Sequence, residues 1–170
     1  AGKLTYTTST GKTKTKQVQS VPPTIELNES WEVSFPPNQG APQKELFDTF
    51  SSWSVSPKAG IRHFSGTAVY KKNFSIPKNL MKSGYSLELD LGSVRVIAEV
   101  IVNGKNLGVI WKAPFTVNLD HVVHEGINEL EVRITNLWPN RLIGDEGLPE
   151  VSDLSVRSIK EWREWLLDHT

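Results

Sequence analysis

The alternation of apolar and polar residues in the middle of the chain constrains its fold more than any other feature. Between 85 and 91 the apolar residues occupy every second position, as Tyr85, Leu87, Leu89 and Leu91. A period of two places one row of side chains in a core and the other in water, as in a strand of an antiparallel sheet. The same period recurs at 94–102, 115–119 and 130–135. The residues predicted to point inward are Leu87, Leu89, Val100, Val117, Leu130, Val132 and Ile134.

Turn signals separate these strands. Asn103-Gly104 tolerates positive φ at both residues and predicts a tight hairpin. Further strands are predicted at 3–8, 12–17, 31–35 and 66–76, and a single helical turn at 46–50. Ser158 can cap a helix over 158–167 whose apolar stripe is Ile159, Trp162, Trp165 and Leu166. The predicted fold is therefore all-β, an antiparallel jelly-roll β-sandwich with one short C-terminal helix.

Length and charge limit the classes of function. A chain of 170 residues suits one domain, which we divide into a hairpin and linker at 1–22 and the sandwich at 23–170. The 19 basic and 19 acidic residues cancel, so no attraction to nucleic acid is expected. The chain contains no run of about 18 apolar residues, so no membrane span is predicted. The chain has no cysteine, which excludes thiolate chemistry.

Few residues suggest catalysis or metal binding. Asp145, Glu146 and Glu150 offer the carboxylates that glycosidic cleavage requires, but a loop rich in Gly and Pro fixes no separation between them. No catalytic residue is therefore predicted. His121 and His124 lack the zincin spacing and a third ligand, so no metal or cofactor is predicted.

Sugar recognition requires an indole to stack on the ring and planar polar groups for the hydroxyls. Trp138, Asn140, Arg141 and Asp145 combine these groups in the segment 136–145, which is predicted to be a loop. Three further candidates beside other predicted loops are Trp53, His63 and Trp111. The alternative is structural: a tryptophan can belong to the core, as predicted for Trp31, and Arg141 can pair with Asp145 to hold the loop. Exposed indoles would favour glycan binding, and buried ones a structural role.

Four segments carry a resemblance to a known family: HFSGTAVYKKNFSI, LELDLGSVRVIAEVIVNGKNLGVIWKAPFTVNL, GINELEVRITN and LWPNRLIGDEGLP. They resemble the galactose-binding-like β-sandwich of bacterial glycoside hydrolases. They are similar to the sugar-binding domain of glycoside hydrolase family 2, and closer to the C-terminal sandwich of the alpha-L-rhamnosidase-like enzymes. The resemblance covers 31–165 and is most specific at 136–145. In that family a large catalytic barrel and a final strand accompany the sandwich, and this chain contains neither.

The resemblance implies a fragment of a larger, secreted or periplasmic enzyme, or a domain of such an enzyme whose last strand was lost. We expect a monomeric, non-catalytic ancillary domain that binds glycan weakly or shapes the edge of the catalytic site. The expected partners are a glycan and the catalytic domain, and a structural calcium ion is not indicated. The alternative is a purely structural sandwich that packs on the catalytic barrel without a ligand. A third reading, an autonomous hydrolase, has the least support. The residues expected to contact sugar are Trp53, His63, Trp111, Trp138, Asn140, Arg141 and Asp145.

Overall fold

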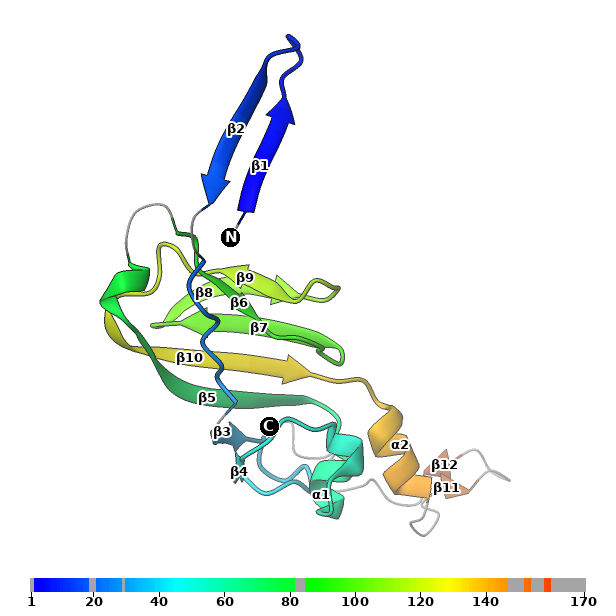
Figure 1. Ribbon diagram of the computed structural model, residues 1–170. Coiled ribbons are helices and arrows are strands. Elements are labelled where there is room, and N and C mark those ends of the chain that lie inside the picture. The colour runs from blue at the N-terminus through cyan, green and yellow to red at the C-terminus, as the bar shows by residue number, and fades with distance from the viewer. Residues whose placement is uncertain are drawn as a thin grey trace.

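A six-stranded antiparallel sheet is the largest element of the fold (Figure 1). The computed structural model describes residues 2–18, 21–28, 30–81 and 85–146, and the backbone of 152–153 and 158–159. The strand order is β4-β3-β5-β10-β7-β8. Their bounds are β3 (Trp31–Ser34), β4 (Lys44–Phe47), β5 (Thr67–Ile76), β7 (Ile97–Val102), β8 (Lys105–Ile110) and β10 (Gly126–Thr135). The predicted all-β antiparallel fold is confirmed.

The two long central strands, β5 and β10, pair along their whole length from Thr67–Thr135 to Ile76–Gly126. Because side chains alternate across a sheet, this register aligns the apolar positions of neighbouring strands on one face. The buried residues of that face include Val33, Ala68, Tyr70, Val100, Leu130 and Val132. The opposite face carries charge: Glu131 pairs with Lys71 at 3.0 Å and with Arg133 at 2.8 Å.

A smaller layer covers part of the apolar face. Strands β6 (Glu88–Asp90) and β9 (Thr116–Asn118) pair with each other, and the Leu119 amide donates to the Leu87 carbonyl at 2.8 Å. Leu87, Leu89 and Val117 pack against the core, as their alternation predicts. This layer and the large sheet form the sandwich.

Aromatic side chains fill another part of the core. Trp31 is 5% exposed, which confirms its prediction as a core residue. Phe35 packs edge-on against Phe64, with ring centroids 4.9 Å apart. Such pairs contribute about 0.5–1.5 kcal/mol each beyond their buried area. This aromatic cluster comprises Trp31, Phe35, Phe47, Trp53, Phe64 and Tyr70. It supports the short helices η1 (Trp53–Val55) and α1 (Ala59–Arg62).

Three predictions of local structure differ from the structure in whole or in part. Residues 44–47 form β4 rather than part of a helical turn at 46–50, because their backbone pairs with β3. The segment at 136–145 is largely helix α2 (Pro139–Glu146) rather than a loop. Most of the helix predicted at 158–167 lies outside the described residues. Its first two residues, however, form β12 (Ser158–Ile159), which pairs with β11 (Ser152–Asp153).

The remaining elements are short. Asn103 and Gly104 have φ of 50° and 76°, which confirms the predicted hairpin turn between β7 and β8. Helix η2 (Lys78–Leu80) follows β5. Strands β1 (Gly2–Thr7) and β2 (Thr13–Val18) form an N-terminal hairpin that stands apart from the sandwich (Figure 1). Within the described residues, no helix has the length and apolar character needed to span a membrane.

Candidate functional site

Helices α1 and α2 lie at the same end of the central strands. Helix α1 ends just before β5, and α2 begins just after β10. Since β5 and β10 are neighbouring strands with Thr67 opposite Thr135, their connections emerge side by side. Pro139 occupies the first position of α2, where a missing amide hydrogen does no harm. The strand ladder therefore places the two helices next to each other (Figure 1).

Side-chain hydrogen bonds join the segments that lead into this end of the sheet. The Asn136 side chain accepts from the Gly66 amide at 2.8 Å and donates to the Phe64 carbonyl at 2.9 Å. The Ser65 hydroxyl donates to the Leu137 carbonyl and accepts from the Arg141 amide, both at 3.0 Å. The Arg141 amide also donates to the Trp138 carbonyl at 3.0 Å, so Ser65 supplies a second acceptor in the first turn of α2. These bonds fix α2 relative to the loop between α1 and β5.

Two glycines allow unusually close packing around α1. A Cβ atom at Gly144 of α2 would lie 2.7 Å from both Cβ and Cγ of His63. A Cβ atom at Gly60 of α1 would lie 1.9 Å from the carbonyl oxygen of Gly40. Both distances are below any that a side chain tolerates, so these positions require glycine while the backbone stays in place.

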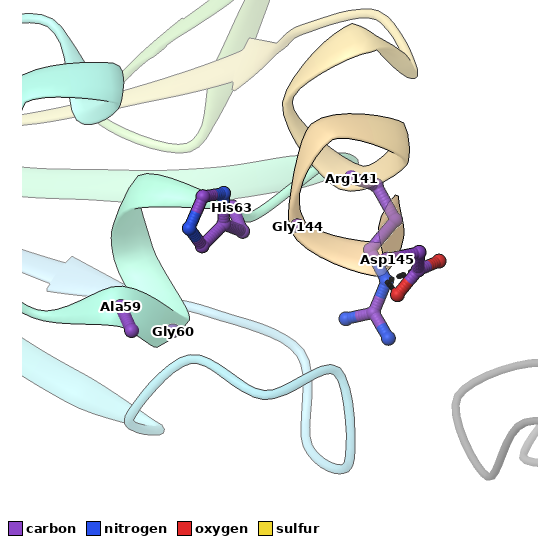
Figure 2. A pocket seen from close by; sticks show the side chains of 6 residues that line it. All are labelled: Ala59, Gly60, His63, Arg141, Gly144 and Asp145. Atoms are coloured by element: carbon purple, nitrogen blue, oxygen red, sulfur yellow. Dashed lines mark hydrogen bonds and ion pairs between the residues drawn. The ribbon is translucent and has the colours of Figure 1, made fainter. Parts of the chain in front are cut away.

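A small open depression of about 170 Å³ lies between the two helices (Figure 2). Arg141 and Asp145 form an ion pair on the side of α2, with Arg141 Nε 3.1 Å from Oδ1 and 3.2 Å from Oδ2. Their side chains are only 18% and 17% exposed. His63 lies between α1 and α2, and its Nε2 accepts from Arg62 Nε at 3.3 Å. The lining residues are Ala59, Gly60, His63, Arg141, Gly144 and Asp145.

The depression offers hydrogen bonding rather than catalysis. A guanidinium, a carboxylate and an imidazole can each bond to hydroxyl groups. The depression is smaller than typical ligand pockets of roughly 300–1,000 Å³, and can accommodate little more than a single sugar ring. Asp145 is the only carboxylate among the lining residues, whereas glycosidases require a pair. No cluster of three metal-ligating side chains occurs in the described part of the chain.

The structure brings together three of the seven predicted sugar-contacting residues. His63, Arg141 and Asp145 line the depression. Trp138 precedes α2 and is 55% exposed, and Asn140 lies in the first turn, but neither lines the depression. Glu150, one of the acidic residues considered for catalysis, lies outside the described residues.

Two of the predicted tryptophans lie away from the depression. Trp53 is 8% exposed within the aromatic cluster, so its prediction as a sugar-stacking residue is corrected to a core role. Its indole Nε1 donates to the Tyr70 hydroxyl at 2.6 Å. Burial raises the pKa of Tyr70 to about 12, although this hydrogen bond acts to lower it. Trp111 follows edge strand β8 and is 66% exposed, and Lys112 Nζ lies 5.4 Å from its ring centroid.

Sequence reasoning missed the residues that shape the site. Ser65 and Asn136 connect segments about 70 positions apart, and Gly60 and Gly144 set the spacing of the helices. The available signals were weak: a Ser-Gly pair before a strand, and an Asn directly after one. Only a fold that pairs β5 with β10 gives these residues a role.

Comparisons with known proteins relate the chain to parts of larger enzymes. No family model matches it. A protein of Formosa agariphila, named provisionally as a beta-glucuronidase, is 50% identical over 169 residues, which are 99% of this chain and 14% of that protein. The solved rhamnosidase of Novosphingobium sp. PP1Y is 30% identical with a TM-score of 0.68, over 94% of this chain and 18% of the enzyme.

More distant structures share the fold. The beta-glucuronidase of an uncultured Clostridium sp. is 22% identical with a TM-score of 0.57, covering 66% of this chain and 22% of the enzyme. A beta-glucuronidase of Ruminococcus gnavus in complex with D-glucaro 1,5-lactone is 20% identical with a TM-score of 0.54, over 65% and 21%.

The fold and the depression define an antiparallel β-sandwich domain with a small polar site at one end of its central strands. The proteins to which the chain is similar are named as a rhamnosidase and beta-glucuronidases, which are glycoside hydrolases, and the chain spans less than a quarter of the length of each.

Proposed function

We propose that this chain is a non-catalytic ancillary domain of a secreted or periplasmic glycoside hydrolase, with a galactose-binding-like fold. The observation that carries the proposal is the small share of each similar protein that this chain covers. Nearly the whole chain matches 14% of one glycoside hydrolase and 18% of another, so most of each relative lies outside the matched region. The single carboxylate of the depression accords with a role other than cleavage.

In this proposal the end of the sandwich that carries α2 contacts glycan. The exposed indole of Trp138 supplies an apolar surface for a sugar ring, and Asn140 follows it two positions later in the chain. His63, Arg141 and Asp145 supply polar partners for hydroxyls in the adjacent depression. Ile110, the last residue of β8, pairs with Ala98 of β7, and Ala98 pairs with Ile134 near the end of β10. Trp111 directly follows Ile110, so Trp111 offers a second exposed indole at the same end of the sheet. A shallow site buries little area, so its affinity for free sugar is weak.

A specific observation favours a second candidate, a structural domain that binds no sugar. Arg141 and Asp145 are largely covered and paired with each other, as expected of an ion pair that holds α2 in shape. The burial of Trp53 also removes one of the predicted stacking surfaces. In this alternative the domain packs on the catalytic part of the enzyme and supports it.

Titration with sugars separates the two candidates. Tryptophan fluorescence and NMR of the indole N–H groups would follow addition of rhamnose, glucuronate and oligosaccharides that contain them. Loss of a stacked indole removes about 0.5–1.5 kcal/mol, so Trp138→Ala is expected to weaken binding by up to roughly tenfold at an unchanged Tm. Trp111→Ala is expected to have a smaller effect, because that indole lies apart from the depression.

The control variant is Trp53→Ala, which is expected to lower the Tm strongly since it leaves a cavity in the core. If no sugar produces a saturable change, or if Trp138→Ala retains full affinity, the structural alternative is favoured.

A further inference from the structure

The N-terminal hairpin is a folded element whose side chains the sandwich leaves exposed. Every residue of β1 and β2 is solvent-exposed. Figure 1 shows the two strands standing away from the sheets. An isolated two-stranded hairpin is at best marginally stable in water, because it lacks a layer beneath it. The hairpin is therefore an element that gains stability when another surface covers it.

The register gives the hairpin two chemically different faces. Residues directly opposite each other share a face, and Gly2 pairs with Val18, Leu4 with Lys16, and Tyr6 with Lys14. One face, called the apolar–basic face, consists of Leu4, Tyr6, Lys14, Lys16 and Val18. The other, called the threonine face, consists of Lys3, Thr5, Thr7, Thr13, Thr15 and Gln17.

The exposed apolar area lies on the apolar–basic face alone. Leu4, Tyr6 and Val18 are 59%, 49% and 37% exposed. On the threonine face, the Thr5 and Thr15 hydroxyls lie 3.3 Å apart and satisfy each other across the strands. The threonine face thus suits water, whereas the apolar–basic face combines large apolar side chains with two cations.

Charge is distributed unevenly between the hairpin and the rest of the chain. Residues 2–18 contain four lysines and neither Asp nor Glu, although the whole chain has 19 basic and 19 acidic residues. The hairpin therefore carries a net charge of +4, and the rest of the 170-residue chain carries −4. A surface complementary to the hairpin is apolar at its centre and acidic at its edge.

The relatives indicate which surface is available. The match to the Formosa agariphila protein omits at most one residue of this chain, so it includes the hairpin, yet it spans only 14% of that protein. We infer that the apolar–basic face docks on an acidic, partly apolar surface of the remainder of the same, longer polypeptide. The identity of that remainder as a glycoside hydrolase rests on the proposed function, but the docking of the hairpin does not.

Hydrogen exchange tests the inference. Amide exchange of the peptide 2–18, followed by mass spectrometry, would be compared between the 170-residue chain and the natural polypeptide that contains it. Docking is expected to slow exchange of the hairpin amides at least tenfold in the longer polypeptide. Tyr6→Thr, which keeps a residue suited to strands, is expected to abolish this slowing by removing the largest apolar contact.

A pair of charge variants provides the matched control. Lys14→Glu with Lys16→Glu reverses both cations of the apolar–basic face and is expected to abolish the slowing. Lys3→Glu with Lys12→Glu makes the same change in net charge on the threonine face and in the turn, and is expected to preserve it. Equal effects of the two double variants would contradict docking through the apolar–basic face.

Three results would overturn the inference, and a fourth would bear on the proposed function alone. Exchange that is equally fast in both polypeptides means that the hairpin remains uncovered. Slowing in the 170-residue chain that grows with its own concentration identifies a second copy as the partner. Slowing that requires added polygalacturonate identifies an anionic glycan. A protected hairpin in a polypeptide without glycosidase activity would leave the docking intact and refute the proposed function.

Discussion

At position 60 a single hydrogen atom determines how closely α1 approaches the preceding loop. A methyl group there would lie 1.9 Å from the Gly40 carbonyl oxygen, which belongs to the backbone and cannot rotate away. Alanine gains about 1 kcal/mol of helix propensity over glycine, but overpacking typically costs about 1–3 kcal/mol or more. The severity of the overlap makes the overpacking dominant. Gly60→Ala is therefore expected to lower the free energy of unfolding by about 2 kcal/mol in urea titrations.

The control is Gly2→Ala, because a Cβ atom at Gly2 meets nothing within 4 Å. Its free energy of unfolding is expected to stay within about 0.5 kcal/mol of the wild type. A neutral Gly60→Ala would mean that the loop around Gly40 moves away without loss.

The buried hydroxyl of Tyr70 makes stability sensitive to alkaline pH. Burial raises the pKa of Tyr70 to about 12 from its ordinary value of 10.0. Between these values the unfolded chain loses the phenolic proton while the folded chain keeps it, so stability is complete below pH 10 and declines toward pH 12. Two pKa units correspond to about 3 kcal/mol. Urea titrations from pH 9 to 12 are expected to show this decline, and Tyr70→Phe is expected to lack that part of it.

At the scale of single elements, the first turn of α2 is joined by a hydrogen bond to a distant segment. The Ser65 hydroxyl accepts from the Arg141 amide, which also donates to the Trp138 carbonyl, so loss of the hydroxyl is expected to cost no more than about 1 kcal/mol. Ser65→Ala is expected to speed amide exchange in the first turn of α2 while leaving β5 and β10 protected. Ser65→Thr, which retains the hydroxyl, is expected to behave like the wild type. Unchanged α2 exchange in Ser65→Ala would show that this hydrogen bond is dispensable.

The same elements show how far sequence alone can predict this fold. The paired strands β7 and β10 were predictable, because a period of two over several residues has no helical counterpart. Helix α2 was predicted as a loop, since Pro139, Asn140 and Gly144 are turn residues in isolation. In the fold, Pro139 suits the first helical position, and Gly144 is required by contact with His63.

The candidate site was predictable only in part, because some of its contacts are local in the sequence and others join distant segments. The pairing of Arg141 with Asp145 was recognisable from the sequence, because a guanidinium and a carboxylate close together in the chain readily form an ion pair. Burial of Trp53 depends on Tyr70 and on the aromatic cluster, which tertiary packing assembles. Contacts between segments about 70 positions apart leave no periodic pattern in a single sequence.

At the scale of the whole molecule, the 170-residue chain is expected to hydrolyse no glycoside. Retaining glycosidases hold two carboxyl groups about 5–5.5 Å apart and inverting ones about 6.5–9.5 Å apart, but the depression contains only Asp145, which pairs with Arg141. Purified protein would be assayed with aryl rhamnosides, glucuronides and galactosides. Turnover above background that disappears in Asp145→Asn would contradict this prediction and establish the chain as an enzyme in its own right.

The uninterrupted pairing of β5 with β10 also restricts how the gene can change in length. Each added residue would advance a strand by about 3.3 Å and turn its buried side chains toward solvent. It would also carry Ser65 or Asn136 out of reach of its partner at the end of the ladder. Insertions and deletions among descendants of this sequence should therefore collect outside these two strands, as in the exposed connection at 111–114, while β5 and β10 keep a constant length.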